Sequence, residues 1–270
     1  MSYLLRRLAY YVVSVVVLLR GVRNWPILLA LLRHSGVPRV VVLADGTKYA
    51  VRSLMDMWII KETNLDRDYE RFGVSIQDGW TIVDIGAGLG DFTVFAARRA
   101  PHGYVYAYEP APDSVELLKE NLSLNNITNV QVHQLAVSDK AGVLALDISH
   151  GVAVQYRTTR IAIYGNNSAH VTVQSISLAE VLEGLPGGSC DFLKIDVEGA
   201  EYEMLLSLGE GSLQRIRRIC LEYHKGVTEY SPTDLEHFFV AHGWHVQVHP
   251  SAVRPELGFL YAENPIPLSV

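Results

Sequence analysis

The segment TIVDIGAGLGDFT, from Thr81 to Thr93, constrains the fold more than any other part of the chain. A short apolar run of β type leads directly into three alternating glycines, Gly86, Gly88 and Gly90, and a helix-compatible sequence follows. Glycine allows φ > 0 and leaves no Cβ between the main chain and a ligand, while the first turn of a helix offers free N–H groups. The segment therefore predicts a strand, loop and helix that bind a nucleotide-like cofactor.

Two features of this loop indicate which cofactor it binds. Its spacing is G-x-G-x-G, whereas a dinucleotide loop usually reads G-x-G-x-x-G. Asp84 precedes the first glycine and Asp91 follows the last, so two carboxylates flank the place of a pyrophosphate and would repel it. A cationic ligand such as S-adenosylmethionine is the better electrostatic match. A NAD-dependent oxidoreductase is the alternative enzyme class, but no Tyr-x-x-x-Lys pair is placed for hydride transfer.

From Trp80 onward, segments of strand and helix type alternate. We expect strands at 81–85, 104–108, 130–134, 143–148, 191–195, 216–222, 244–248 and 258–262, and helices at 91–99, 113–124, 200–208 and 232–242. Such alternation predicts an α/β fold with a mostly parallel sheet and helices on both faces. The region 142–175 is rich in Gly, Asn, Thr and Tyr and is expected to form an inserted hairpin or loop, with a turn at 165–168.

Polar residues that follow the strands are candidates for ligand binding, because such sheets bind ligands beyond the carboxyl ends of their strands. Glu109 ends one strand 19 residues after Gly90 and is placed to accept the ribose hydroxyls. Its alternative role is a helix-start acid before Pro110. After the third strand, adenine could lie against the backbone near Ala136, and a structural turn there is the alternative.

A second group of polar residues could bind the acceptor or move a proton. Asp196 ends a strand, Glu198 and Glu201 follow it, and clustered carboxylates suit substrate positioning or proton transfer. Glu201 could instead complement the helix dipole. His224 lies just beyond the next strand, and its intrinsic pKa near 6.5 suits a general base. A magnesium ion on the three carboxylates is an alternative, but our prediction contains no metal site, and we interpret the histidines at 242, 245 and 249 as exposed rather than zinc-binding.

Taken together, these motifs resemble the FkbM-type methyltransferases. The resemblance rests, in order, on residues 83–93, 106–110, the helix Leu118-x-x-Asn121-x-x-x-Asn125, 193–201 and 221–224, and it covers roughly 56–262. It implies a Rossmann-like class I methyltransferase fold with a seven-stranded sheet and an antiparallel last strand, and S-adenosylmethionine as donor. It also implies O-methylation of a sugar, glycolipid or polyketide-like metabolite. One departure is Gly88, where family members often carry Asn.

The motifs give a definite set of site residues. The predicted catalytic residues are Asp196, His224 and Glu198. The predicted cofactor-binding residues are Asp84, Gly86, Ala87, Gly88, Gly90, Thr93, Glu109, Pro110, Ala136 and Asp196.

Residues 1–39 lie outside the resemblance and differ in composition from the rest. Residues 1–44 contain six arginines and no acidic residue, although the whole chain has a net charge of -6. The uncharged apolar stretch 8–19 is shorter than the ~20 residues of a spanning helix, and no signal-peptide cleavage site follows. The segment is expected to form helices that either cap the body or lie in a membrane interface. The second interpretation would also fit a non-catalytic membrane-surface adaptor.

A β-hairpin at 40–52, with an Asp45-Gly46 turn, is expected to lead into a methyltransferase domain at 40–270. The 49% hydrophobic content supports a large core, and the acidic body argues against a nucleic-acid partner. Cys190 and Cys220 are expected to be buried free thiols, as in a reducing cytoplasm. We therefore expect a cytoplasmic location, with a peripheral position at the inner membrane face as the alternative, and the sequence indicates no oligomeric state.

Overall fold

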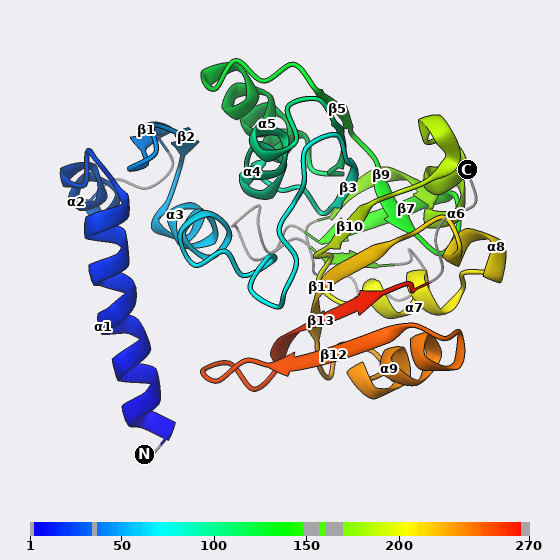
Figure 1. Cartoon of the computed structure of the whole chain (residues 1–270). Helices are drawn as coiled ribbons and strands as arrows, with labels where there is room; N and C mark the ends of the chain where they lie inside the picture. The colour runs from blue at the N-terminus through cyan, green and yellow to red at the C-terminus, as the bar shows by residue number, and fades with distance from the viewer. Residues whose placement is uncertain (1–2, 34–36, 148–156, 160–169, 266–270) are drawn as a thin grey trace.

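The computed structural model describes residues 3–33, 37–147, 157–159 and 170–265. A seven-stranded sheet forms its centre, in the order β12-β13-β11-β10-β3-β4-β5 (Figure 1). Its strands are β3 (Thr81–Ile85), β4 (Tyr104–Tyr108), β5 (Val130–His133), β10 (Phe192–Ile195), β11 (Arg218–His224), β12 (His245–Pro250) and β13 (Leu257–Glu263). Only β13 runs antiparallel to its neighbours. The predicted mostly parallel sheet with an antiparallel last strand is confirmed.

The order of the strands reverses in the middle of this sheet. The chain enters at β3, adds β4 and β5 on one side, and later returns to place β10 on the other side of β3. Connections that leave two adjacent strands in opposite directions open a crevice at their carboxyl ends. Gly86 follows β3 and Asp196 follows β10, so the sheet brings these two predicted site residues to the same crevice.

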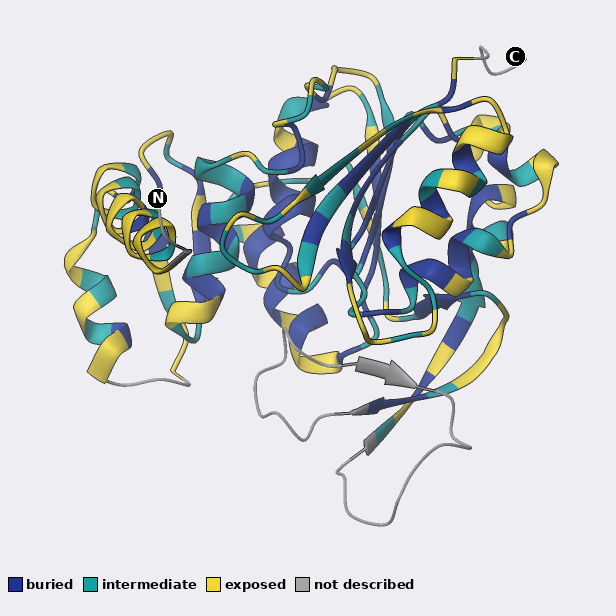
Figure 2. Ribbon diagram, turned by 90° about the horizontal axis from the view of Figure 1, so that it is seen from below, coloured by how far each residue is buried: buried dark blue, intermediate teal, exposed yellow. Residues whose placement is uncertain are grey.

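Helices cover both faces of the sheet (Figure 2). One face packs against α4 (Asp91–Arg99) and α5 (Pro112–Leu124), and the other against α6 (Leu178–Glu183), α7 (Glu201–Leu206) and α9 (Pro232–Ala241), with the short α8 (Glu210–Leu213) beside α6. Because both faces are buried, the central strands β3 and β10 are mostly apolar rather than alternating, apart from the paired Asp84 and Lys194. Cys190 and Cys220 are buried free thiols within these cores, as predicted.

The predicted insertion forms part of a separate small sheet with the order β6-β9-β7-β8. Its strands are β6 (Ala136–Ser138), β7 (Gly142–Asp147), β8 (Arg157–Thr159) and β9 (His170–Ser177), and β7 pairs antiparallel with β9. The turn expected at 165–168 lies outside the described residues. Helix α6 was not predicted, although Ser177 and Glu180 form a capping box whose S-x-x-E pattern stood in the sequence.

The segments before the central sheet form an outer layer. The predicted hairpin is confirmed as β1 (Arg39–Val42) paired with β2 (Lys48–Val51). The helix α3 (Leu54–Ile60) follows the hairpin and continues as a π-helix at Lys61–Leu65. Outside these lie α1 (Tyr3–Gly21) and α2 (Pro26–Arg33) (Figure 1). No helix among the described residues is long and apolar enough to cross a membrane.

Asn121 on α5 and Asn125 at its C-cap bind the edge of the hairpin, and Asn121 also contacts the glycine loop. The Asn121 side chain accepts the Ala50 N–H at 2.6 Å and donates to the Leu89 carbonyl at 2.8 Å. The Asn125 side chain accepts the Lys48 N–H at 2.9 Å and donates to the Lys48 carbonyl at 2.7 Å. These amides satisfy backbone groups along one edge of β2 that would otherwise lack partners. The spacing Asn121-x-x-x-Asn125 therefore serves the placement of the loop.

Candidate active site

The loop after β3 passes directly against the loop after β10. Gly86 has φ +74°, and a Cβ at this position would lie 1.8 Å from the carbonyl oxygen of Asp196. The backbone N–H groups of Gly86 and Ala87 both donate to the Tyr108 carbonyl at 3.0 Å. A side chain on residue 86 would separate the two strand ends, so this position requires glycine for steric as well as conformational reasons.

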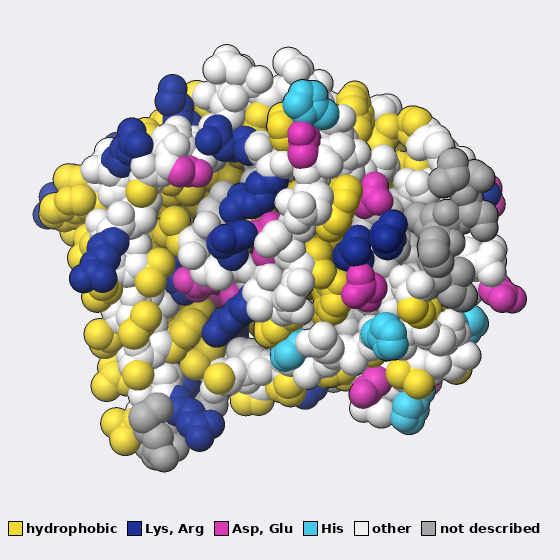
Figure 3. Space-filling model, viewed as in Figure 1, with side chains coloured by type: hydrophobic (Ala, Val, Ile, Leu, Met, Phe, Trp, Pro, Cys, Tyr) yellow, Lys and Arg dark blue, Asp and Glu magenta, His cyan; other side chains and the backbone are white. Residues whose placement is uncertain are grey.

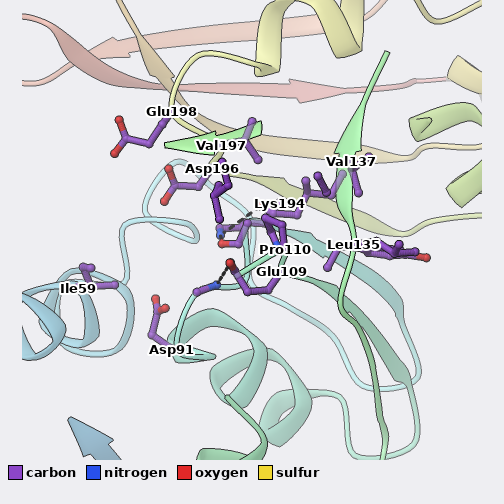
Figure 4. Close-up of a pocket in the computed structure, with 16 residues that line it drawn as sticks. Ile59, Asp91, Glu109, Pro110, Leu135, Val137, Lys194, Asp196, Val197 and Glu198 are labelled. Atoms are coloured by element: carbon purple, nitrogen blue, oxygen red, sulfur yellow. Dashed lines mark hydrogen bonds between the residues drawn. The ribbon is translucent and has the colours of Figure 1, made fainter. Parts of the chain in front are cut away.

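Glu109 holds the second turn of the loop in place. Its Oε2 accepts the Gly88 N–H at 2.8 Å and its Oε1 accepts the Ala111 N–H at 2.9 Å (Figure 4). Burial raises the pKa of Glu109 to about 7, against the opposing effect of these two hydrogen bonds and of Lys194. A carboxylate oxygen accepts more than one hydrogen bond. Both oxygens can therefore accept further donors from a ligand in the adjoining cavity.

Asp84 lies beneath the loop and is paired with a buried cation. The Lys194 ammonium lies 3.1 Å from Asp84 Oδ1 and donates to the Gly86 carbonyl at 2.8 Å, while the Thr93 hydroxyl donates to Asp84 Oδ2 at 2.6 Å. The argument that Asp84 repels a pyrophosphate was therefore wrong, because Lys194 compensates its charge. Asp84 and Thr93 are buried and do not line the cavity, and their contacts support the loop, so their predicted contact with a cofactor stays a prediction.

The remaining loop residues shape the turn that leads into α4. Ala87 is buried, and its carbonyl accepts the Gly90 N–H at 2.8 Å. Gly90 has φ +87° and immediately precedes α4. Neither residue lines the cavity. Within the described part of the chain, these two predicted cofactor residues fix the backbone on which Gly86 and Gly88 are presented.

One cavity collects the other predicted cofactor residues. It is lined by Gly86, Gly88, Glu109, Pro110, Ala136, Asp196 and Glu198, together with the apolar side chains of Ile59, Leu135 and Val137 (Figure 4). Asp91 also lines it, although the sequence argument treated this residue only as a flanking charge. Its Oδ2 accepts the Thr63 hydroxyl at 2.5 Å, and burial raises its pKa to about 6. The cavity thus has carboxyl groups on one part of its wall and an apolar surface on another.

A second cavity lies beside the first and shares Asp196 and Glu198 with it. Its lining comes from distant parts of the chain and includes Met55, Trp58, Ile59, Glu62, Glu222, His224, Lys225, Val227, Arg254 and Glu256. Asp196 also accepts a hydrogen bond from the buried Tyr69 hydroxyl at 3.1 Å. Sequence reasoning missed Tyr69, Trp58, Glu62 and Arg254, because no local motif marks residues that meet only through the fold.

Glu62 connects three separate elements at this second cavity. Its Oε1 accepts the Trp58 indole N–H at 2.8 Å, the Tyr10 hydroxyl at 3.0 Å and an Arg254 N–H at 3.3 Å. These donors come from α3, α1 and the connection between β12 and β13. Glu62 lies in the π-helix, which also buries Lys61, and π-helical turns are frequent at functional sites.

His224 is buried at the end of β11 between two carboxylates. Its Nδ1 lies 3.4 Å from Glu201 Oε1, and its Nε2 lies 3.6 Å from Glu198 Oε2. Burial lowers the pKa of His224, but the hydrogen bond with Glu201 and the negative charges around the ring outweigh burial and raise the pKa to about 9. The sequence argument used an unperturbed pKa near 6.5. In the folded protein the imidazole is therefore mainly protonated at neutral pH.

The sequence suggested that Glu201 forms a cluster with Asp196 and Glu198, but in the structure its carboxylate binds backbone N–H groups instead. Its oxygens accept the backbone N–H of Gly199 at 2.6 Å and that of His224 at 2.9 Å, and the side chain is buried. Glu198, directly before Gly199, has φ +53°, an uncommon conformation for a residue other than glycine. Across the described residues, no group of three or more His, Cys, Asp or Glu side chains could hold a metal ion. Glu201 thus orients His224 and the strand end.

Comparisons with known proteins show the family to which this chain belongs. A family described as Methyltransferase FkbM domain matches residues 84–246. The 31-O-demethyl-FK506 methyltransferase FkbM from Streptomyces tacrolimicus is 26% identical over 217 residues, which cover 70% of this chain and 83% of that protein. Hexuronic acid methyltransferase AglP from Haloferax volcanii is 24% identical over 215 residues, which cover 74% of this chain and 82% of that protein. The solved structure of Methyltransferase FkbM from Methylobacillus flagellatus aligns with a TM-score of 0.48 at 13% identity, over 89% of this chain and 59% of that one.

Proposed function

The chain belongs to the FkbM family of S-adenosylmethionine-dependent methyltransferases, and we propose that it methylates a hydroxyl group of a sugar, glycolipid or polyketide-like acceptor. The observation that carries this proposal is the pair of adjoining cavities that share Asp196 and Glu198. One cavity has the character of a cofactor site, and the other contains His224 and could admit an acceptor. Two relatives, a 31-O-demethyl-FK506 methyltransferase and a hexuronic acid methyltransferase, support a hydroxyl acceptor.

The residues of the first cavity fit S-adenosylmethionine. Glu109 would accept the ribose hydroxyls, because both of its oxygens retain acceptor capacity. The apolar wall near Ala136 suits adenine, and the carboxyl groups of Asp91 and Asp196 suit the positive charges of the ligand. The bound cofactor supplies a methyl group on a sulfonium sulfur and leaves as S-adenosylhomocysteine.

His224 is our candidate for the general base, with Asp196 as the alternative. As the bond between the acceptor oxygen and the methyl carbon forms, the hydroxyl proton passes to the neutral imidazole. Glu201 holds the ring through Nδ1, which leaves Nε2 on the side of Glu198 and the cavity. Because the pKa of His224 is about 9, the neutral form becomes abundant only in alkaline solution. The positive charge of S-adenosylmethionine bound near Asp196 would lower the pKa of His224.

The second cavity has the groups expected of a site for a hydroxylated acceptor. Glu62 and Glu222 can accept hydrogen bonds from hydroxyl groups, while Arg254 and Lys225 can donate them. Trp58 offers an aromatic surface of the kind that packs against an apolar face of a ligand. The site therefore suits a polyhydroxylated molecule with some apolar surface.

The proposal is tested first by binding. Thermal unfolding is measured with S-adenosylmethionine, S-adenosylhomocysteine and NAD in parallel, and a ligand at 100 times its Kd should add about 2.7 kcal/mol to the stability. We expect stabilisation by the first two. Stabilisation by NAD alone would contradict the methyltransferase assignment and favour an oxidoreductase.

Turnover is tested second, as release of S-adenosylhomocysteine with a panel of sugars, uronic acids and polyketides. At least one hydroxylated acceptor should support release, and mass spectrometry should locate the methyl group on oxygen. Methylation on nitrogen or carbon would overturn the O-methyltransferase proposal. Cofactor binding without turnover on any acceptor would favour the non-catalytic adaptor instead.

A further inference from the structure

Helix α1 presents most of its apolar side chains to the outside rather than to the body. Ser14 faces inward and is 1% exposed, whereas Leu8 is 61% exposed. The outward apolar set of α1 comprises Leu4, Leu5, Leu8, Val12, Val13, Val15, Val16 and Leu19. A helix that only caps a soluble domain turns its apolar stripe toward the core. The apolar side of α1 therefore faces away from the body, and capping alone does not explain this orientation.

Helix α2 extends the same kind of surface. Its Leu31 packs inward and is buried, while Leu29 and Leu32 are exposed, the latter by 65%. Trp25 immediately precedes α2 and is also exposed. Tryptophan is enriched where an apolar phase meets polar headgroups. We call the exposed apolar side chains of α1 and α2, together with Trp25, the outer face.

Positive charge accompanies the outer face. Arg6, Arg20 and Arg33 are exposed, and residues 1–44 contain no acidic residue. Figure 3 shows hydrophobic side chains along α1 with basic side chains among them. A second copy of the chain seated on this face would bring arginines against arginines, which is unfavourable. An anionic lipid surface complements both the apolar and the cationic character.

We propose that the outer face binds an anionic lipid bilayer, with α1 and α2 lying flat in the interface. Each short apolar helix would bury its exposed side chains among the acyl chains while the arginines contact acidic headgroups. This arrangement requires no spanning segment, because the helices lie in the plane of the interface. It also gives a function to the outward orientation of the apolar side of α1.

The docked helix would also stand beside the acceptor cavity. Tyr10 on the inner side of α1 donates to Glu62, which lines that cavity. The bilayer would then lie about one helix diameter, roughly 10–12 Å, from the cavity wall. An acceptor attached to a lipid fits this distance. This second step rests on the proposed methyltransferase function, whereas the bilayer binding does not.

Vesicle co-sedimentation of the full chain tests the bilayer binding. The probes are phosphatidylcholine vesicles with and without phosphatidylglycerol. The native chain should bind the anionic vesicles, and the combined substitution of Leu8, Val12, Val15 and Leu19 by Gln should weaken binding at least tenfold. Glutamine preserves helix propensity, and the substituted side chains are exposed, so folding is retained. Val240→Gln, an equally exposed apolar position on α9, is the matched control and should bind like the native chain.

Charge is tested separately with Arg6→Gln combined with Arg20→Gln. This variant should lose the preference for anionic vesicles, and added salt should have the same effect on the native chain. The proposal is overturned if the native chain binds neither kind of vesicle, or if the four glutamines leave binding unchanged. The proposal is also overturned if the native chain forms a dimer and does not bind vesicles, and the four glutamines abolish this dimer. Because vesicle binding is read without turnover, its outcome is independent of the proposed catalytic function.

Discussion

The two adjoining cavities are built in different ways. The cofactor cavity takes its polar residues from the ends of neighbouring strands β3, β4 and β10, where Gly86, Glu109 and Asp196 meet. The second cavity, the proposed acceptor cavity, combines residues of α3, the π-helix, β11 and the connection between β12 and β13, and Tyr10 of α1 contacts it through Glu62. The first cavity is therefore formed mainly at the strand ends of the sheet, whereas the second also depends on segments packed around the sheet.

This difference has a consequence for how each part responds to change. In the cofactor cavity, side chains bind backbone N–H groups and carbonyls, so substitutions should alter loop geometry and cofactor affinity. In the acceptor cavity, side chains mainly contact one another, so substitutions should alter turnover and its pH dependence. The variants below separate these two responses.

His224→Gln should have the largest effect, since it removes the proposed base while keeping a polar side chain. Loss of a general base costs about 10²–10⁴-fold in turnover. In the native protein, turnover should rise with pH up to about 9, because His224 must lose its proton to act. Rates measured across this pH range should lose the rising limb in the variant.

Asp196→Asn distinguishes the two candidate bases. The negative charge of Asp196 helps to raise the pKa of His224, so its removal should move the rising limb to lower pH if His224 is the base. If Asp196 is the base instead, Asp196→Asn should abolish turnover and His224→Gln should retain it. Unchanged turnover in both variants would refute both assignments.

Lys194→Met should have the next largest effect, on stability. It leaves the carboxylate of Asp84 buried without its cation, and breaking a buried pair costs about 3–5 kcal/mol. Urea unfolding should show this loss, and the additional substitution Asp84→Asn should recover part of it. Lys119→Met, on the exposed side of α5, is the control and should change stability by less than about 0.5 kcal/mol. An equal loss in both lysine variants would rule out a role for the pair.

Glu109→Gln should reduce affinity for S-adenosylmethionine. Hydrogen bonds to a charged acceptor contribute about 1.5–3 kcal/mol, which corresponds to roughly 10- to 150-fold in Kd. Because the pKa of Glu109 is about 7, native affinity should fall as the pH drops below 7, where the carboxyl becomes protonated and accepts less. Calorimetric titrations across this range test both effects. A Kd that responds neither to the substitution nor to pH would remove the proposed ribose contact.

A pair of alanine variants gives the finest comparison within the loop. Gly86 and Gly88 both have positive φ, so both substitutions introduce backbone strain. Only Gly86→Ala also brings a Cβ against the Asp196 carbonyl, whereas a Cβ at Gly88 meets nothing within 4 Å. Gly86→Ala should therefore cost about 1–3 kcal/mol more than Gly88→Ala in chemical unfolding. Equal costs would show that the close approach of the two loops does not matter.

The cofactor half of the site was predictable because its signals are local. The strand at 81–85 and helix 91–99 have the predicted bounds, since apolar runs, glycines and helix-forming residues act on their own neighbourhood. The role of Asp84 was not predictable in the same way. Its partner Lys194 lies 110 residues later and faces it only because β3 and β10 pair in register.

The acceptor half was predictable only in part. His224 and Asp196 were predicted because each lies at the carboxyl end of a strand. The pKa of His224 could not be anticipated, because it depends on carboxylates brought around the ring by the turn at Glu198 and by the buried Glu201. Tyr10, Glu62 and Arg254 lie in three separate segments, and no spacing in the sequence relates them.

The separation of the two cavities is tested most directly by measuring cofactor Kd and single-turnover rate on the same two variants, Glu109→Gln and His224→Gln, at pH 9. The account predicts that Glu109→Gln weakens S-adenosylmethionine binding at least tenfold while retaining most of the rate at saturating cofactor. It predicts that His224→Gln keeps the native Kd within a factor of about three and loses at least a hundredfold in rate. If each variant changed both quantities alike, the division into a cofactor cavity and a catalytic cavity would be contradicted.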